Sequence, residues 1–230
     1  MFATSFLPTR LLTTSKTVAT DPEARRALHM ACSILLDYPT AERYENFELI
    51  KTELEAAALP AEIHEELRAF FSAEELSSHQ RLEEHYVGVF DMKRRATMYL
   101  SYYLTGDTRK RGTALVRFIE AYRAGGCEIE REELPDYLPM VLEFSALGDT
   151  QIAGDLLSSH REGIELLRTT LEQVESPYAH LARALCMTLP PISDETKERY
   201  IRLITDGPPA ELVGAHALGP LEPNLSLTKR

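Results

Sequence analysis

Apolar residues in this chain recur at intervals of three and four residues, and this periodicity constrains the fold more than any other feature. One face of a helix presents residues at that interval, whereas a half-buried strand needs alternation at every second residue. The helical interval is clear in the ranges 28–35, 63–71 and 115–122. No segment shows sustained alternation of period two. The sequence therefore predicts an all-α, single-domain bundle of several helices.

Helix-start and helix-stop residues divide this pattern into elements. Asp21-Pro22-Glu23 is a good helix start, and Gly106 and the pair at 125–126 are placed to end helices. We expect further helices in the ranges 44–58, 82–90, 98–103, 138–142, 164–174, 181–189 and 194–204. The predicted organisation is a flexible tail over 1–20, a helical domain over 21–205 and a flexible, Pro/Gly-rich tail over 206–230.

Composition restricts the class of partner. The formal net charge of −11 opposes non-specific binding to nucleic acid or anionic lipid and favours a cationic partner. No run of about 20 apolar residues is present, so direct membrane insertion is not expected. The three cysteines are widely spaced and odd in number, which predicts neither a disulfide framework nor a structural zinc site and favours a reducing cytoplasm.

Signatures of catalysis are missing from the sequence. The seven histidines never form the HExxH spacing that places two zinc ligands on one helical face. The segment from Gly106 to Gly112 lacks the Gly-Lys-Ser/Thr ending of a phosphate loop, and no Gly-x-Ser-x-Gly elbow occurs. We therefore predict a protein that is not an enzyme and that holds no metal or cofactor of its own.

Two basic clusters flank a tyrosine-rich segment. They comprise residues 93–95 and 109–111, and such a pattern can combine phosphate contacts with base stacking. Asp91, Asp107 and Glu120 are close enough in sequence to pair with these cations on a solvated face. Together with the acidic balance of the chain, this makes nucleic-acid binding the weakest of the functional hypotheses.

The aromatic residues between 86 and 103 have two interpretations. Large rings with polar rims, together with an adaptable methionine, are typical of helix-in-groove recognition. Rings at helical spacing are also the usual content of a hydrophobic core, and the sequence does not separate the two roles. The residues concerned are Tyr86, Phe90, Met98, Tyr99, Tyr102 and Tyr103.

A second apolar stripe carries carboxylates beside it. Leu138, Pro139 and Leu142 form the stripe, and Asp136 and Glu143 flank it. Asp136 is placed to cap a helix beginning near residue 137, because a carboxylate can accept a hydrogen bond from an N-terminal backbone N–H group. Helix capping and ligand contact both remain open for Asp136.

Three ordered blocks of sequence carry a resemblance to a known family. They are HYVGVFDMKRR (85–95), YYLTGDTRKRG (102–112) and ELPDYLPMVLEF (133–144). These blocks resemble the respiratory nitrate reductase delta-subunit family of NarJ-type chaperones, and the similarity spans most of the expected folded region. Many members have His where this chain has Tyr137, so a titratable role at that position does not carry over.

The resemblance implies a fold and a function. It implies the helical bundle of the redox-enzyme maturation chaperones, which are related to the chaperones of twin-arginine signals. The implied function is a cytoplasmic chaperone that binds the N-terminal peptide of the nitrate reductase catalytic (alpha) subunit. It would hold the apoenzyme for molybdenum-cofactor and iron–sulfur insertion before membrane docking, with molybdenum-cofactor delivery proteins as further partners. The expected peptide-binding residues are Tyr86, Phe90, Asp91, Tyr99, Tyr103, Asp136, Leu138, Pro139 and Glu143.

An alternative in another class stays open. In that alternative the protein carries the molybdenum cofactor directly, or is a helical enzyme with a site of histidines and carboxylates. Metal or pterin retained in stoichiometric amount by the purified protein would favour it.

Overall fold

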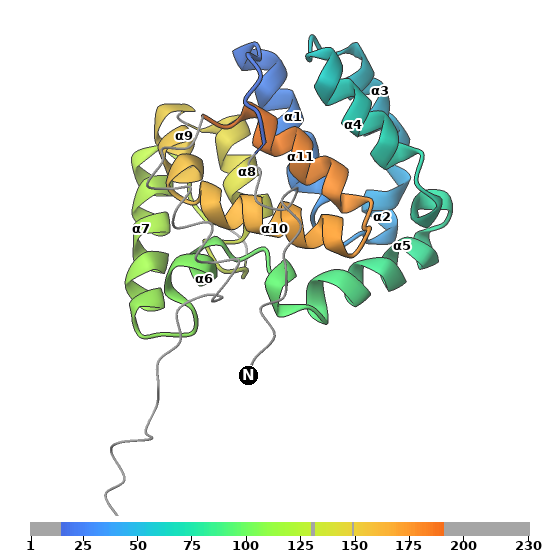
Figure 1. Cartoon of the computed structure of the whole chain (residues 1–230). Helices are drawn as coiled ribbons and strands as arrows, with labels where there is room; N and C mark the ends of the chain where they lie inside the picture. Colours follow the sequence, from blue (N-terminus) through green and yellow to red (C-terminus); the bar gives the residue numbers. More distant parts are fainter. Residues whose placement is uncertain (1–14, 130–131, 149, 191–230) are drawn as a thin grey trace, which may run out of the picture.

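The computed structural model describes residues 15–129, 132–148 and 150–190, and helices make up most of this part of the chain (Figure 1). The α-helices are α1 (Pro22–Leu35), α2 (Ala41–Glu45), α3 (Phe47–Ala56), α4 (Ala61–Phe71), α5 (His79–Tyr86), α6 (Leu100–Thr105), α7 (Lys110–Ala124), α8 (Leu138–Leu147), α9 (Thr150–Ser159), α10 (Arg161–Gln173) and α11 (Tyr178–Thr188). Short 3-10 turns η2 (Glu74–Ser77) and η4 (Arg94–Ala96) and a π-helical turn η3 (Val87–Asp91) complete the set. The predicted all-α class is confirmed.

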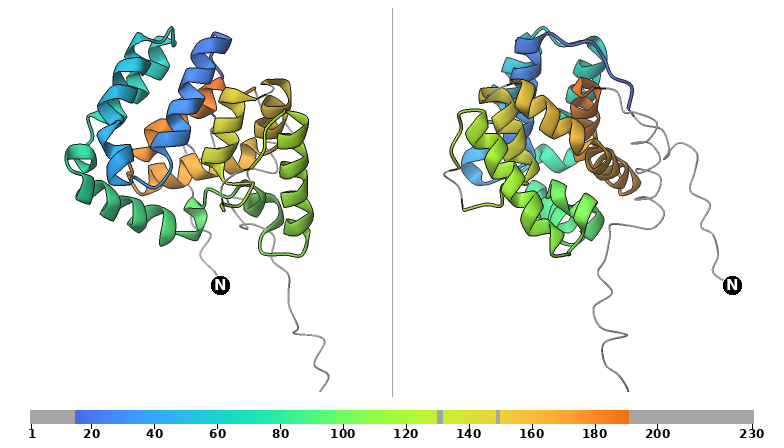
Figure 2. Two further views of the ribbon diagram at one scale, coloured as in Figure 1. Left: turned by 180° about the vertical axis from the view of Figure 1, so that it is seen from behind. Right: turned by 90° about the vertical axis from the view of Figure 1, so that its left-hand side faces the viewer.

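The helices pack around one hydrophobic core. Helix α1 lies against α8 on one side of the molecule, and α10 and α11 lie together on the opposite side, with α4 beside α11 (Figure 2). Helices α7 and α9 cover one end of this arrangement, and α5 and α6 run along its lower edge in the view of Figure 1.

Local signals explain several helix boundaries. Asp21 caps α1, its carboxylate accepting from the backbone N–H groups of Glu23 at 2.8 Å and Ala24 at 3.3 Å, and Pro22 occupies the first turn, where a missing N–H is harmless. Helix α6 ends at Gly106, whose φ of 57° lies in the region that favours glycine. Both boundaries agree with the sequence prediction.

The region of α2 and α3 and the region of α9 differ from the prediction. The range 44–58 is interrupted at Asn46, whose side-chain amide donates to the carbonyl of Glu42 at 2.9 Å and so satisfies the end of α2. Helix α9 was not predicted; four of its ten residues are Gly, Ser or Asp, which weakens its apolar pattern. The predicted helix over 194–204 and the tail over 206–230 lie outside the described residues.

Helix α10 buries charged side chains among its apolar ones. Arg161, Glu165 and Arg168 are almost inaccessible to solvent, with exposed fractions of 1%, 0% and 5%. Glu165 pairs with Arg161 at 3.2 Å and with Arg168 at 2.8 Å, and Glu172 joins Arg168 at 2.8 Å to Arg183 of α11 at 2.5 Å. We call these five residues the α10 ladder.

Two neighbouring members of the α10 ladder, Arg168 and Glu172, hold their charges for the same reason. Burial by itself favours the neutral form of Arg168, but Glu165 and Glu172 outweigh it and raise its pKa. Burial likewise favours neutral Glu172, but Arg183 and Arg168 outweigh it and lower its pKa. Arg168 and Glu172 therefore form an ionised pair within the α10 ladder.

Candidate functional site: a tyrosine-lined surface

A group of aromatic rings lies where the end of α1, the α5–η3 segment and the start of α8 meet. Tyr38 lies edge-to-face on Tyr86 with ring centroids 5.4 Å apart, and the Tyr86 ring is 4.6 Å from that of Phe90. Tyr99 and Tyr137 lie with centroids 5.4 Å apart. Offset contacts of this kind are favourable beyond simple area burial. We call Tyr38, Tyr86, Phe90, Tyr99 and Tyr137 the tyrosine cluster.

Hydroxyl groups tie the buried part of the tyrosine cluster together. The Tyr137 hydroxyl donates to Oδ1 of Asp37 at 3.2 Å, and the Tyr86 hydroxyl lies 3.2 Å from the Tyr137 oxygen and 3.3 Å from the carbonyl oxygen of Leu36. The other carboxylate oxygen of Asp37 pairs with Arg43 at 2.7 Å. These contacts fix the orientation of two rings behind the surface.

The buried tyrosines do not titrate near neutral pH. Burial raises the pKa of Tyr86 far above its ordinary value of 10, and Tyr137 raises it further. Burial also raises the pKa of Tyr137, with a further contribution from Asp37. Both hydroxyls therefore stay protonated hydrogen-bond donors at every physiological pH.

Other members of the tyrosine cluster present ring surface to solvent. Tyr38 is 38% exposed, Phe90 and Tyr99 are half-buried, and the neighbouring Val87 is also 38% exposed. Carboxylates lie at the rim, because Asp91 is exposed and Glu133 accepts a hydrogen bond from the Tyr99 hydroxyl at 3.0 Å. The surface thus offers aromatic faces with negative charge beside them.

A π-helical turn places Phe90 at this surface. In η3 the backbone N–H of Met92 donates to the carbonyl of Val87, five residues earlier, at 3.2 Å. The Phe90 ring then rests on Tyr86 and on Tyr178 of α11, 5.1 Å away. Single π-helical turns are frequent at functional sites. The predicted helix over 82–90 gave no sign of this change in register.

Asp136 lies beside the tyrosine cluster and is fully buried. Its Oδ2 accepts from the backbone N–H of Ser101 at 3.1 Å and from the Ser101 hydroxyl at 2.6 Å, while α8 has no side-chain cap. The expectation that Asp136 caps the helix starting near residue 137 is therefore wrong. It caps α6 instead, because an antiparallel bridge between Tyr99 and Tyr137 places the start of α6 against Asp136.

Arg111 connects Asp136 to the tyrosine cluster. Its guanidinium lies 5.6 Å from the centre of the Tyr99 ring and 3.9 Å from Oδ2 of Asp136. It also pairs with Asp107 at 3.6 Å, and Arg94 approaches the same carboxylate at 4.0 Å. Pairing of the two basic clusters with Asp107 is thus confirmed, and Arg111 acts as a cation between a ring and a buried carboxylate.

Several of the predicted peptide-binding residues lie in the interior. Tyr103 is 1% exposed, its hydroxyl donates to the carbonyl of Thr97 at 2.6 Å, and its ring packs directly on Gly163. Leu138 and Pro139 are buried in the first turn of α8. In this conformation Tyr86, Tyr103, Asp136, Leu138 and Pro139 support the surface and do not line it. Phe90, Asp91 and Tyr99 are the predicted residues that a ligand can reach here.

Glu143 belongs to a separate hollow. It is half-buried in the wall of a cavity of about 220 Å³ between the end of α7 and α8. The structure therefore divides the predicted residues between two places on the surface. The cavity is lined by Tyr122, Cys127, Glu128, Ile129, Met140, Glu143, Phe144 and Leu147.

Two histidines have hydrogen-bonding roles. The His29 ring lies between the hydroxyls of Ser145 at 2.8 Å and Thr188 at 2.9 Å, and burial lowers its pKa to about 3. His85 contacts the Ser176 hydroxyl at 2.8 Å. In the described part of the chain, no group of three or more His, Cys, Asp or Glu residues is arranged to hold a metal ion.

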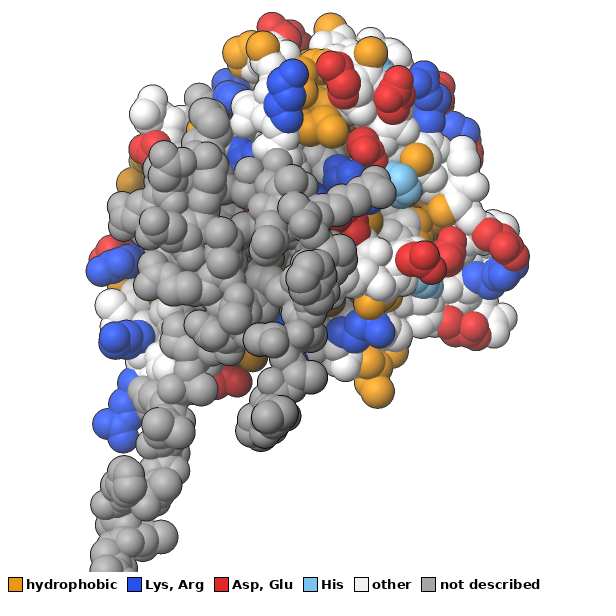
Figure 3. Space-filling view, in the orientation of Figure 1, with side chains coloured by type: hydrophobic (Ala, Val, Ile, Leu, Met, Phe, Trp, Pro, Cys, Tyr) orange, Lys and Arg blue, Asp and Glu red, His pale blue; other side chains and the backbone are white. Residues whose placement is uncertain are grey.

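Charges of both signs are interspersed on the uncovered part of the face in Figure 3, with no continuous basic strip there. No helix in the described ranges is long and apolar enough to cross a membrane. The described residues thus form an all-helical bundle with a partly exposed aromatic surface that carboxylates rim. Sequence comparison identifies the family of helical proteins to which the chain belongs. The family described as "Nitrate reductase delta subunit" matches residues 55–183, and the chain belongs to this family.

Relatives with curated names support the same assignment. The chain is 32% identical over 165 residues to the probable nitrate reductase molybdenum cofactor assembly chaperone NarJ of Bacillus subtilis, covering 72% of this chain and 89% of that one. It is 30% identical over 150 residues to the NarJ chaperone of Escherichia coli K12, covering 65% and 64%. It is also 38% identical over 158 residues to the nitrate reductase-like protein NarX of Mycobacterium tuberculosis H37Rv, covering 68% of this chain but only 23% of NarX.

Proposed function

We propose that this protein is an assembly chaperone for a nitrate reductase. It would bind the N-terminal segment of the catalytic subunit and hold the apoenzyme during insertion of the molybdenum cofactor. Membership of the delta-subunit family supports this proposal, as do relatives named as nitrate reductase molybdenum cofactor assembly chaperones.

The tyrosine cluster is the observation that carries the proposal. Tyr38, Phe90 and Tyr99 come from three separate segments, and their rings reach the surface beside a buried, hydrogen-bonded layer. Aromatic rings supply large contact areas at a low cost in conformational entropy, and a rigid support keeps that cost low. Such a surface suits the apolar face of a short amphipathic peptide.

The charges beside the tyrosine cluster favour a basic peptide. Asp91 and Glu133 lie at its rim, and the whole chain has a net charge of −11. Carboxylates at a rim orient arginine or lysine residues and speed association more than they add affinity. We therefore assign binding energy chiefly to the rings and orientation chiefly to Asp91 and Glu133, with Glu143 as a further carboxylate in the separate cavity between α7 and α8.

The energetics require several apolar anchors. Ordering a short peptide costs about 2–5 kcal/mol, whereas micromolar to nanomolar binding corresponds to about −8 to −12 kcal/mol net. Exposed charge pairs contribute only about 0–1 kcal/mol each, so they cannot supply this difference. Added salt should weaken binding without abolishing it.

The site of action that we propose is the cytoplasm, before the reductase docks at the membrane. Cys32, Cys127 and Cys186 are all free thiols, as expected of a reducing compartment. Iron–sulfur insertion into the catalytic subunit would proceed while the chaperone holds it, with molybdenum-cofactor delivery proteins as transient partners.

Calorimetric titration tests the proposal. The full chain is titrated with a synthetic N-terminal peptide of the cognate catalytic subunit, with a scrambled peptide as control, at two salt concentrations. The expected result is saturable one-to-one binding of the authentic peptide, weakened by salt. Heats that are equal for the two peptides would contradict the proposal, and affinity that vanishes at moderate salt would contradict the aromatic mechanism.

A further inference from the structure

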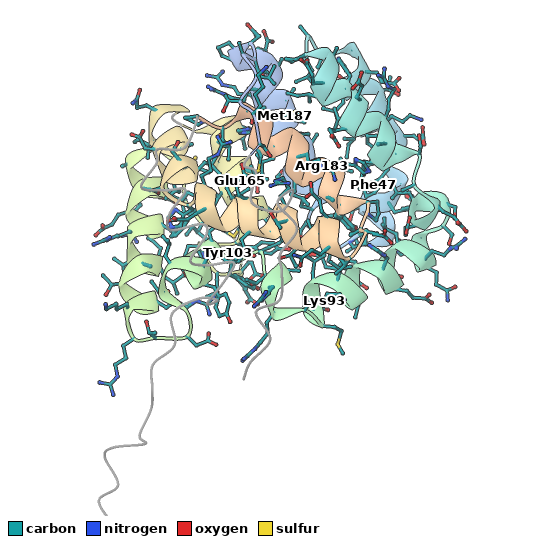
Figure 4. All side chains as sticks on the ribbon, in the orientation of Figure 1. Phe47, Lys93, Tyr103, Glu165, Arg183 and Met187 are labelled. Atoms are coloured by element: carbon teal, nitrogen blue, oxygen red, sulfur yellow. The ribbon has the colours of Figure 1, made fainter. Side chains whose placement is uncertain are left out.

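Residues 15–20 form a non-helical segment that runs beside the ends of α10 and α11. Its first residues contact two charged side chains of the α10 ladder, and its later residues contact main-chain carbonyl groups at the end of α11. Figure 4 labels Glu165 on α10 and Met187 on α11, two of the groups concerned. We call residues 15–20 the N-terminal strap.

Ser15 is held through its main chain. Its backbone N–H donates to Oε1 of Glu165 at 3.0 Å, and Nη2 of Arg161 donates to its carbonyl oxygen at 3.1 Å. The Ser15 hydroxyl adds a longer contact to the other Glu165 oxygen at 3.4 Å. A buried acid and a buried base therefore recognise the N–H and C=O groups of a single residue.

The next part of the N-terminal strap is held by the end of α11. The Thr17 hydroxyl donates to the carbonyl of Leu189 at 2.8 Å, and the backbone N–H of Val18 donates to the carbonyl of Met187 at 2.8 Å. The last carbonyls of a helix have no partner within the helix, so they are free to accept from another segment. Nη1 of Arg161 also donates to Leu189, at 2.7 Å, which joins the two sets of contacts.

None of the strap residues belongs to the hydrophobic core. Ser15, Thr17 and Val18 are half-buried, and Lys16 and Ala19 are exposed. The segment is thus fixed by hydrogen bonds that its own main-chain and hydroxyl groups make, without an apolar anchor. Those groups would serve equally in any segment with the same pattern of donors and acceptors.

The two charged side chains that hold the N-terminal strap are themselves fixed in the interior of the bundle. Glu165 is 0% and Arg161 1% exposed, and both are held in place by the α10 ladder. Among the described residues, Nε of Arg161 has no hydrogen-bond partner although it is buried. Buried polar groups are normally satisfied, so an unpartnered donor here indicates a site with remaining binding capacity.

We infer that Arg161, Glu165 and the carbonyls of Met187 and Leu189 form a binding site for a non-helical, hydroxyl-bearing polypeptide segment, and that residues 15–18 are its resident, exchangeable occupant. The site shares no residue with the tyrosine cluster and does not depend on the proposed chaperone function. While the N-terminal strap is bound, other segments are kept out. Its release opens a second place on the bundle where a polypeptide can bind.

The test measures exchange of the N-terminal strap in the full chain. Hydrogen exchange at the Val18 amide reports occupancy, and the probe is a synthetic peptide with the sequence of residues 13–21, TTSKTVATD, with a scrambled control. A tethered segment has an effective concentration in the millimolar range, so about millimolar peptide should be needed to speed Val18 exchange in the wild type.

Ser15→Pro removes the N–H donor to Glu165, and Lys16→Ala, at an exposed position of the same strap, is the matched control. The Ser15→Pro chain should bind the peptide at a concentration at least about tenfold lower than the wild type, and Lys16→Ala should behave as the wild type. Thr17→Ala, which leaves Glu165 partnered, replaces Ser15→Pro if that variant has a lower Tm. In the wild type without added peptide, a Val18 amide that exchanges as fast as in the free peptide would overturn the inference. Peptide affinity that is equal in the wild type and the variants, or absent from all of them, would also overturn it.

Discussion

The α10 ladder and the tyrosine cluster are two polar networks built on different chemistry. The ladder consists of formal charges, and Arg161, Glu165 and Arg168 are almost completely buried. The tyrosine cluster uses neutral hydroxyls, of which Tyr137 donates to the buried carboxylate of Asp37 and Tyr99 to Glu133 at the rim, and the rings of Tyr38 and Phe90 reach solvent. Buried charges must be paired throughout, whereas neutral hydroxyls tolerate a partly open environment. The first network therefore fixes the bundle, and the second leaves surface available for binding.

The largest effect is expected from breaking the α10 ladder at its centre. Glu165→Leu leaves two buried arginines without their shared partner, and loss of one member of a buried ion pair costs about 3–5 kcal/mol. Urea unfolding measures this loss. The control is Glu48→Gln, since Glu48 forms an exposed pair with Lys51 at 3.6 Å and its loss should cost less than about 0.5 kcal/mol. Similar losses for the two variants would show that the ladder does not fix the bundle.

A smaller effect is expected where α10 meets α6. A methyl group on Gly163 would lie 2.5 Å from the Tyr103 ring, so Gly163→Ala should destabilise by about 1–3 kcal/mol through overpacking. Gly154 in α9 has open space around the same position, and Gly154→Ala should stabilise by about 0.5–1 kcal/mol. The two variants thus have opposite signs in a thermal unfolding experiment. Stabilisation by both would place the Tyr103 ring away from Gly163.

A pH titration tests the hydrogen bonds of the neutral His29 ring, which join α1 to α8 and α11. The pKa of His29 is lowered to about 3, below its ordinary value of 6.5, so the unfolded chain takes up the proton first as the pH falls. Stability from this group is present above pH 6.5 and is lost between pH 6.5 and 3. Between pH 7.5 and 5.5 the loss should be about 1.4 kcal/mol, and a His29→Gln variant should lack this component. An unchanged pH dependence in the variant would refute the role of His29.

The smallest effect is expected at the rim of the tyrosine cluster. Tyr99→Phe removes a half-exposed hydrogen bond to Glu133 while the ring remains, so the free energy of unfolding should fall by no more than about 0.5–1 kcal/mol. Burial, together with Glu133, raises the pKa of Tyr99 to about 12, so the comparison can be made at any pH up to about 9. A loss above about 2 kcal/mol would mean that this hydroxyl is part of the buried network.

The sequence predicted helices well where the signal was local. Pro22 and Gly106 marked boundaries through backbone chemistry that does not depend on the rest of the fold. Asp136 was assigned to the wrong helix, because its partner Ser101 is distant in sequence and is brought near only by the pairing of Tyr99 with Tyr137. A cap that a distant segment supplies cannot be recognised from the sequence around the helix.

The site was harder to predict than the fold. Helical spacing cannot tell Tyr103, which fills the core, from Tyr99, which reaches the surface. The roles of Asp37 and Tyr137 were missed because Asp37 looks like a helix end and Tyr137 like the first residue of another helix. The resemblance to the family indicated the segments in which the tyrosine cluster lies, but the division between support and surface depends on packing.

Calorimetric titration of matched variants with the N-terminal peptide of the cognate catalytic subunit tests the central claim most directly. Phe90→Ala removes a ring from the tyrosine cluster, and Leu49→Ala removes an apolar side chain that is 60% exposed on α3. The account predicts at least about a tenfold loss of affinity, about 1.4 kcal/mol, for Phe90→Ala, and wild-type affinity for Leu49→Ala. Wild-type affinity in a folded Phe90→Ala protein would contradict the assignment of the tyrosine cluster as the peptide-binding surface.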